Sequence, residues 1–174
     1  VDFNRFSFEK YNISGVSVIK QKNNWSVYSP SDGRIHNGFL VITEGSCVYV
    51  WDGVEVNLSP GAIIYLPKGS RHSVTAQMKS LEYFRVNFTV TDVESAEEIV
   101  FSDTPILITH SAPEKIMEIC SDLTSLTLRP HTDFKTMTYL CELLDFSVRV
   151  LNSSTAKGID IAVNYISEHC VEQI

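Results

Sequence analysis

Residues 38–72 read GFLVITEGSCVYVWDGVEVNLSPGAIIYLPKGSRH, and this stretch decides the fold. Its short β-prone runs are separated by Glu44-Gly45, Asp52-Gly53 and Pro60-Gly61. Asp-Gly between apolar runs predicts a β-hairpin, because both central residues of a type I′ turn need a positive φ. Several short strands at such even spacing predict a β-sandwich or a small β-barrel.

Further strands are predicted on both sides of this stretch. The runs 16–19 and 25–28 are β-prone and are separated by a polar segment, and residues 29–33 are expected to form a turn. Residues 81–90 alternate apolar and polar side chains, which predicts a strand with one buried face. Residues 106–108 are expected to form a last short strand or a sheet edge.

Helical periodicity replaces the strand pattern in the last third of the chain. Pro113 and Glu114 are expected to open a helix, since proline suits a first turn and an acidic side chain there suits the helix dipole. Asp133 is expected to cap a second helix. The composition of residues 152–158 predicts a flexible linker, followed by a third helix from Ile159.

The composition is ordinary for a soluble globular protein and argues against nucleic-acid binding by this chain alone. The 14 basic and 21 acidic side chains give a net charge of −7, and the basic ones are scattered rather than clustered. No apolar run could span a membrane, and no signal peptide is recognisable. Four widely spaced cysteines are expected to be reduced thiols of a cytoplasmic protein. The ends at Val1 and Ile174 lead us to expect a segment of a longer protein.

A cupin-like motif pair lies within residues 38–72. The spacing of Gly61, Pro67, Gly69 and His72 resembles the second sequence motif of the cupin superfamily, and Gly45 stands where the first motif should end. The resemblance implies a jelly-roll barrel, that is, a double-stranded β-helix. Together with the predicted helices, it implies an α+β fold in which a cupin-like barrel precedes two amphipathic helices.

The metal ligands that the cupin motifs imply are mostly absent. The superfamily's pattern expects two histidines near positions 32 and 34 and a carboxylate at 38, where this chain has Asp32, Arg34 and Gly38. The last motif position, usually asparagine, is Ala76, so only His72 of the ligand set remains. Because a 2-His-1-carboxylate site needs three convergent ligands, we predict neither a metal nor another cofactor.

Enzymatic activity has little support in the sequence. We find no Ser/His/Asp order in a motif context, no close pair of carboxylates and no phosphate-cradling glycine loop. We therefore predict no catalytic residue. A metal-dependent cupin enzyme, an isomerase or a dioxygenase, is the alternative, in which His36 and His72 would meet inside the barrel. A purely structural dimerisation module with a filled barrel is a third possibility.

The C-terminal residues resemble the first helix of the DNA-binding domain of AraC-type transcriptional regulators. In that family the helix carries an Ala-x-x-Tyr-Ile core, an acidic residue and a closing isoleucine, which correspond here to Ala162, Tyr165, Ile166, Glu172 and Ile174. The order of barrel, two helices, linker and this helix is similar to the AraC/XylS type over nearly the whole chain. The resemblance implies a small-molecule effector, a homodimer, and DNA contact only through a domain beyond Ile174.

A ligand site is predicted at the mouth of the barrel. Strand alternation places 34, 36 and 38 on one face, and 47, 49 and 51 on one face of the next strand. An arginine offers a planar fork for a carboxylate or vicinal hydroxyls, and aromatic faces suit a sugar or a flat ring. Each residue also has a structural reading, as a core aromatic, a hydrogen-bonded histidine or a solvent-facing arginine. The candidates are Arg34, His36, Tyr49, Trp51 and His72, together with Trp25 and Tyr65 on weaker parity arguments. Tyr28, Tyr83 and Arg85 are further candidates on the same weaker arguments.

The second predicted helix has an apolar stripe wider than one buried face needs, because Phe134 and Leu143 extend it. Part of the stripe is expected to pack on the barrel and on the first helix, and the remainder to form a dimer seam across a two-fold axis. The residues assigned to dimerisation are Met137, Leu140, Cys141, Leu144, Val148 and Leu151.

The expected organisation has four parts. Residues 1–110 form a ligand-binding barrel, 111–152 a helical dimerisation region, 153–158 a linker, and 159–174 the start of a DNA-binding domain. The function expected from this order is effector sensing and dimerisation in a bacterial regulator, with a sugar, small carboxylate or aromatic compound bound in the barrel.

Overall fold

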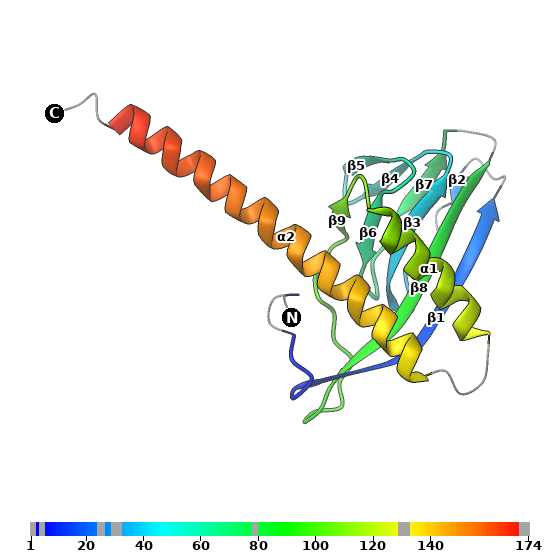
Figure 1. The fold of residues 1–174 in the computed structure, drawn as a ribbon. Helices are drawn as coiled ribbons and strands as arrows, with labels where there is room; N and C mark the ends of the chain where they lie inside the picture. Colours follow the sequence, from blue (N-terminus) through cyan, green and yellow to red (C-terminus); the bar gives the residue numbers. More distant parts are fainter. Residues whose placement is uncertain are drawn as a thin grey trace.

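The computed structural model describes residue 3 and residues 6–23, 27–28, 33–77, 80–128 and 133–170, and it describes no side chain at 23, 27, 28, 133 and 154–170. Two antiparallel β-sheets face each other, and two helices lie across the outer face of one of them (Figure 1). The predicted α+β class is therefore confirmed.

The strand order of the described sheets is that of a jelly roll. Sheet A has the order β1-β8-β3-β6-β9, and sheet B has the order β2-β7-β4-β5. Consecutive strands mostly lie in different sheets, as when two Greek keys wind through a double sheet, so the cupin-like barrel is confirmed. The bounds are β1 Tyr11–Asn23, β2 Val27–Tyr28, β3 Asn37–Glu44, β4 Cys47–Trp51, β5 Val54–Leu58, β6 Ile63–Leu66, β7 Ser73–Ala76, β8 Leu81–Asp92 and β9 Ile106–Thr109.

The Asp-Gly turn forms the predicted hairpin between β4 and β5. Trp51 pairs with Val54, and the two residues between them have φ values of 47° at Asp52 and 78° at Gly53. Both values are positive, as a type I′ turn requires.

The first strand is longer than the sequence indicated. β1 continues through the polar segment that was expected to interrupt it and pairs with β8 along its length. Lys20 and Lys22 stand on its outer face, where both form ion pairs with Glu82. Their polarity therefore marks one face of a strand rather than a loop.

The helices begin where the sequence predicted. α1, Glu114–Thr127, has Pro113 as its N-cap and buries the expected apolar stripe, Ile116, Ile119, Leu123 and Leu126. α2 spans Asp133–Cys170 and continues away from the barrel (Figure 1). Its backbone is helical across 153–158, where a flexible linker was expected. The assignment of a domain boundary there stays a prediction.

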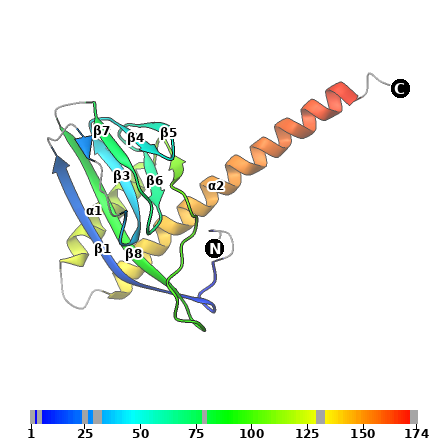
Figure 2. The ribbon, with the colours of Figure 1, turned by 180° about the vertical axis from the view of Figure 1, so that it is seen from behind.

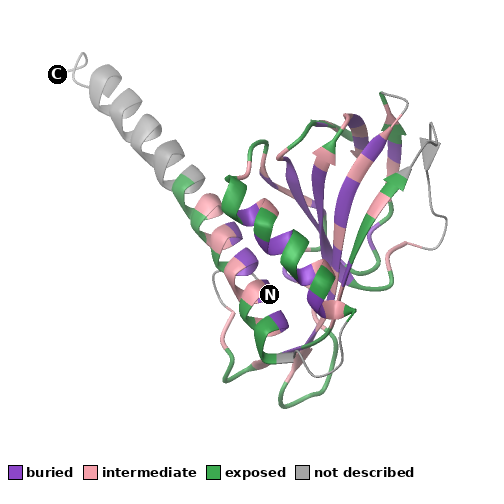
Figure 3. Ribbon diagram, turned by 45° about the vertical axis from the view of Figure 1, so that its right-hand side comes forward, coloured by how far each residue is buried: buried purple, intermediate pink, exposed green. Residues whose placement is uncertain are grey.

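The two faces of sheet A build two separate cores. The inner core lies between the sheets and includes Leu40, Ile42, Ile64, Leu66 and Tyr83 from sheet A. The outer core lies between sheet A and the two helices. The buried sides of the helices face the sheet in Figure 3. Figure 2 shows the barrel from behind. The outer core includes Phe39, Val41, Phe84, Val86, Phe88, Ile116, Ile119, Leu123, Leu140, Leu143 and Leu144.

The cysteines whose side chains are described are all free thiols. Burial raises the pKa of Cys47 to about 11 and that of Cys120 to about 12, so both stay protonated at neutral pH. Cys141 is only partly buried, and the Cys170 side chain lies outside the described residues. In the described part of the chain, no helix has the length and apolar character needed to cross a membrane.

Candidate functional site

Arg34 lies just before β3 and is held by its backbone and its side chain. Its N–H donates to the Ser70 carbonyl at 3.1 Å, and its carbonyl accepts from the Gly69 N–H at 2.7 Å. Its guanidinium donates through Nη2 to Asn87 Oδ1 at 2.8 Å. These bonds fix the guanidinium beside β8, on the face that carries the inner core.

Gly38 makes room for that guanidinium. A Cβ added at Gly38 would lie 2.1 Å from the Val86 carbonyl oxygen and 2.8 Å from Arg34 Nη2. A side chain at this position would therefore collide with the β8 backbone and displace the arginine. The position where the cupin pattern expects a metal-binding carboxylate is thus used to seat a cation.

An aromatic stack on sheet B faces this part of sheet A. Tyr49 stacks on His72 with ring centroids 4.7 Å apart and an interplanar angle of 18°, and Trp51 lies tilted against Tyr49 at 5.8 Å. Tyr49 and Trp51 are buried in the inner core, and His72 is partly buried. Burial, together with the positive charge of Arg34, lowers the pKa of His72 to about 4, so His72 is neutral at pH 7.

The lowered pKa makes stability depend on pH. A histidine whose pKa is lower in the folded state contributes stability that is present above its unfolded value of about 6.5 and is lost as the pH falls through the folded value. We expect the free energy of unfolding to fall between pH 6.5 and pH 4, with His72 contributing at most about 3 kcal/mol.

Urea denaturation at several pH values, in wild type and His72→Gln, measures this contribution. The loss over that window should be smaller in the variant. Equal losses in both proteins would show that His72 is not the titrating group.

The structure brings together four of the seven predicted ligand residues, namely Arg34, Tyr49, Trp51 and His72. His36 is exposed, and only its backbone carbonyl takes part, accepting from Arg34 Nε at 3.3 Å. The alternation argument does not hold at 34–36, because β3 begins only at Asn37.

Tyr65 does not join this group. Tyr65 is fully buried in the outer core, edge-on to Phe3 at 4.9 Å, since its neighbours in β6 face the inner core. Trp25 lies outside the described residues. Sequence reasoning also missed Asn87, although its alternation with Tyr83 along a confidently predicted strand would have placed it on the inner face.

Among the described residues, no group of three or more His, Cys, Asp or Glu side chains could hold a metal ion. His72 is accompanied by Tyr49 and Arg34 rather than by further ligands. An arginine guanidinium stays protonated in proteins and has no lone pair for a metal.

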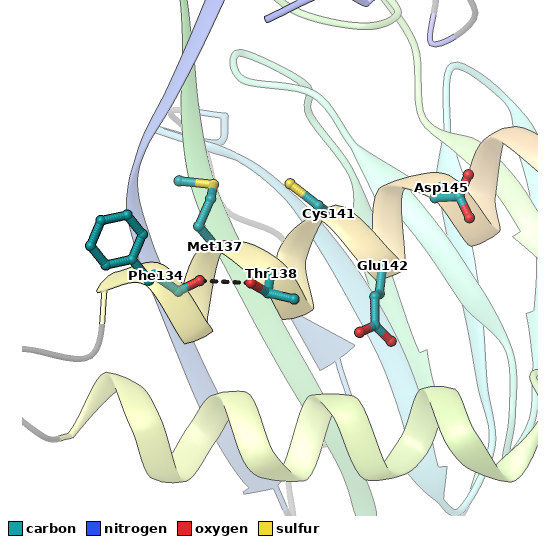
Figure 4. A pocket seen from close by; sticks show the side chains of 6 residues that line it. All are labelled: Phe134, Met137, Thr138, Cys141, Glu142 and Asp145. Carbon is teal, nitrogen blue, oxygen red and sulfur yellow. Dashed lines mark hydrogen bonds between the residues drawn. The ribbon is translucent and has the colours of Figure 1, made fainter.

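Five of the six predicted dimerisation residues belong to the chain's own outer core or pack against it, and Cys141 is the exception. Leu140 and Leu144 are buried in the chain's own outer core, where a partner cannot reach them. Met137, Cys141, Val148 and Leu151 are only partly buried. A groove runs along the free side of the helix and is shown in Figure 4, lined by Phe134, Met137, Thr138, Cys141, Glu142 and Asp145.

Comparison with known proteins gives a family match and several similar folds. The chain matches the AraC-like ligand binding domain family over residues 14–144. Similar solved structures include apo ToxT from Vibrio cholerae, with 12% identity over 84% of this chain and 56% of that chain and a TM-score of 0.49. EutQ from Clostridium difficile has 16% identity over 48% and 57%, with a TM-score of 0.35.

A Cupin 2 conserved barrel domain protein from Salinispora arenicola is also similar, with 21% identity over 40% of this chain and 73% of that chain and a TM-score of 0.30. The chain thus spans little more than half the length of ToxT and of EutQ. No curated protein matches the sequence.

Proposed function

Because the chain belongs to the family of AraC-like ligand-binding domains, we propose that it is the effector-sensing and dimerisation region of a bacterial AraC-type transcription regulator. The observation that carries the proposal is the seating of Arg34 beside Asn87, opposite the stack of His72 on Tyr49, between two facing sheets. In this proposal the chain is not an enzyme and works in the cytoplasm.

The proposed organisation follows the order of the chain. Residues 1–110 bind the effector, and 111–152 form the dimer. DNA is contacted only by a helix-turn-helix domain that starts near 159. Since the backbone of α2 is helical through 153–158, that segment would pass changes to the DNA-binding domain as part of a helix rather than as a loose linker.

The side chains between the sheets suit a small polar molecule with a flat or apolar part. Tyr49 and Trp51 offer aromatic surface, which packs well against a sugar ring or an aromatic ring. In this proposal the Arg34 guanidinium, besides donating to Asn87 Oδ1 and to the His36 carbonyl, donates to a carboxylate or to neighbouring hydroxyls. We therefore propose a sugar, a small carboxylate or an aromatic compound as the effector.

A hydrogen-bonded route leads from Arg34 to the outer side of sheet A. The turn that holds the Arg34 backbone also contains Lys68, whose N–H donates to Asn37 Oδ1 at 3.3 Å. Asn37 Nδ2 in turn donates to the Ile99 carbonyl at 2.8 Å, and Lys68 pairs with Glu98. A ligand that binds Arg34 would shift the conformational equilibrium of this turn and of the 98–101 loop. The size of the shift would be set by the difference in the ligand's affinity for the alternative conformations.

Ligand screening in wild type and Arg34→Ala tests the proposal. We expect some member of a panel of pentoses, hexoses, benzoate and short-chain carboxylates to raise the melting temperature of the wild type. Loss of the guanidinium should weaken that compound's binding at least about tenfold in Arg34→Ala, measured by calorimetry.

Arg149→Ala is the matched control, because Arg149 is an exposed arginine on α2 that pairs with Asp145. It should bind the same compound with unchanged affinity. Failure of the whole panel to stabilise the wild type would count against effector sensing, and equal affinities in all three proteins would remove Arg34 from the site.

A further inference from the structure

Arg85 lies in the middle of β8, on the face that points toward sheet B. Its strand neighbour two residues back, Tyr83, is buried in the inner core, and its neighbour two residues on, Asn87, holds Arg34. In the sheet it stands between Leu40 of β3 and Ile19 of β1. Because directly paired residues of antiparallel strands share a face, the guanidinium of Arg85 belongs to the inner side of the barrel.

Arg85 is a partly buried cation without a counter-charge in the described part of the chain. Its Nε is buried and makes no hydrogen bond, and no ion pair joins it to a described carboxylate. The amide oxygen of Gln21, diagonal to Arg85 on the same face, is likewise buried and unbonded. The inner positions of β1, β3, β6 and β8 carry no Asp or Glu among the described residues.

Such an arrangement is costly unless something completes it. A buried donor left without a partner destabilises the fold, and an unpaired charge does so more strongly. Elsewhere on the same strand the charged Glu82 is paired with Lys20 and Lys22 on the outer face. The charged side chain on the outer face of β8 therefore has ion-pair partners, whereas Arg85 on the inner face has no described carboxylate as a partner.

A side chain next to Arg85, at the edge strand β1, is accessible to solvent. Ile19 lies on the inner side, directly opposite Arg85, and yet 42% of its surface is exposed. Its neighbour Val18, on the outer side, is only 3% exposed. We take this edge of sheet A as the side from which a small molecule would approach Arg85.

Resting on the proposed effector-sensing function, we infer that the effector is a carboxylate whose charged group is bound by Arg85. The carboxylate would accept from the guanidinium as a planar, two-oxygen partner. The apolar body of the molecule would lie against Leu40, Tyr49 and Tyr83, which belong to the inner core. A phosphate ester fits less well, because its second charge would need further donors among apolar neighbours, and a neutral sugar would leave Arg85 without a counter-charge.

Paired carboxylates and amides test this inference directly. The probes are benzoate with benzamide and hexanoate with hexanamide, at matched ionic strength, with the 174-residue chain as wild type, Arg85→Gln, Arg85→Met and Arg149→Gln. We expect a carboxylate to raise the melting temperature of wild type and of Arg149→Gln, while its amide has little effect. Arg85→Gln should bind that carboxylate at least about tenfold more weakly.

The apolar variant provides a readout that does not depend on the probe. Arg85→Met should melt at a higher temperature than the unliganded wild type. If Arg85 serves binding, it costs the unliganded protein stability, and the apolar Met side chain fits the inner core without that cost. Equal stabilisation by amides and carboxylates, or undiminished carboxylate binding in Arg85→Gln, would overturn the inference and leave effector sensing in place. Stabilisation by neither kind of probe, with Arg85→Met less stable than wild type, would overturn both.

Discussion

Replacing Asn37 with alanine is expected to lower the free energy of unfolding by about 3 kcal/mol, since the Tyr65 hydroxyl, the Lys68 N–H and the Ile99 carbonyl would each lose a partner. Asn37 is fully buried at the start of β3. Its Oδ1 accepts from the Tyr65 hydroxyl at 2.8 Å and from the Lys68 N–H, and its Nδ2 donates to the Ile99 carbonyl.

Urea denaturation of Asn37→Ala measures the loss, and Asn57→Ala is the matched control. Asn57 is an exposed strand asparagine in β5 that accepts one hydrogen bond from Gln77. Its replacement should cost less than about 0.5 kcal/mol, as is usual for surface positions. Equal costs at the two positions would mean that the Asn37 network does not stabilise the fold.

The same network joins the ligand side of the molecule to its N-terminal segment. The Tyr65 hydroxyl that donates to Asn37 also accepts from the Phe101 N–H at 3.1 Å, and Phe101 stacks on Phe3 at 4.5 Å. Phe3 is itself buried. Asn37 therefore links β3, β6 and the loop before β9 to the start of the chain, so its removal should also loosen the N-terminal segment.

Local signals in the sequence sufficed for the sheets and for the start of each helix. Asp52-Gly53 predicted a type I′ turn, in which both central residues have positive φ values. The alternation in 81–90 predicted β8 and its buried face. The polar run 20–24 misled because its lysines lie on one face of β1 and pair with Glu82. That pairing joins residues far apart in the chain, which no local pattern reveals.

The candidate site was predicted only in part, for reasons that lie in tertiary structure. Asn37 precedes an apolar run and was not singled out, yet it is fully buried and bonded to three residues in two distant segments, Tyr65, Lys68 and Ile99. His36 was misplaced because alternation was counted beyond the start of β3. Tyr65 was misplaced because the sequence alone does not show which face of its strand is the inner one. Arg34 was found by its motif position, but what seats it is the missing side chain at Gly38.

The second large expected effect concerns dimerisation through the free side of α2. Phe134 is 96% exposed although it is a large aromatic residue, and it begins an apolar flank that continues through Met137 and Cys141 (Figure 4). If this flank is the proposed dimer seam, a charge placed on it faces its own copy across the two-fold axis. We expect Phe134→Glu to raise the dissociation constant of the dimer about 100-fold, about 2.8 kcal/mol, in sedimentation equilibrium.

The choice of position separates assembly from folding. Phe134 contributes little to the core of its own chain, and an acidic side chain in the first turn of a helix suits the helix dipole, so α2 should stay intact in Phe134→Glu. Val93→Glu, at an exposed valine beyond β8, adds the same charge away from α2 and should leave the dimer unchanged. A monomeric wild type, or equal dissociation constants in the two variants, would show that α2 packs on the barrel alone, because Leu140 and Leu144 already account for its attachment there.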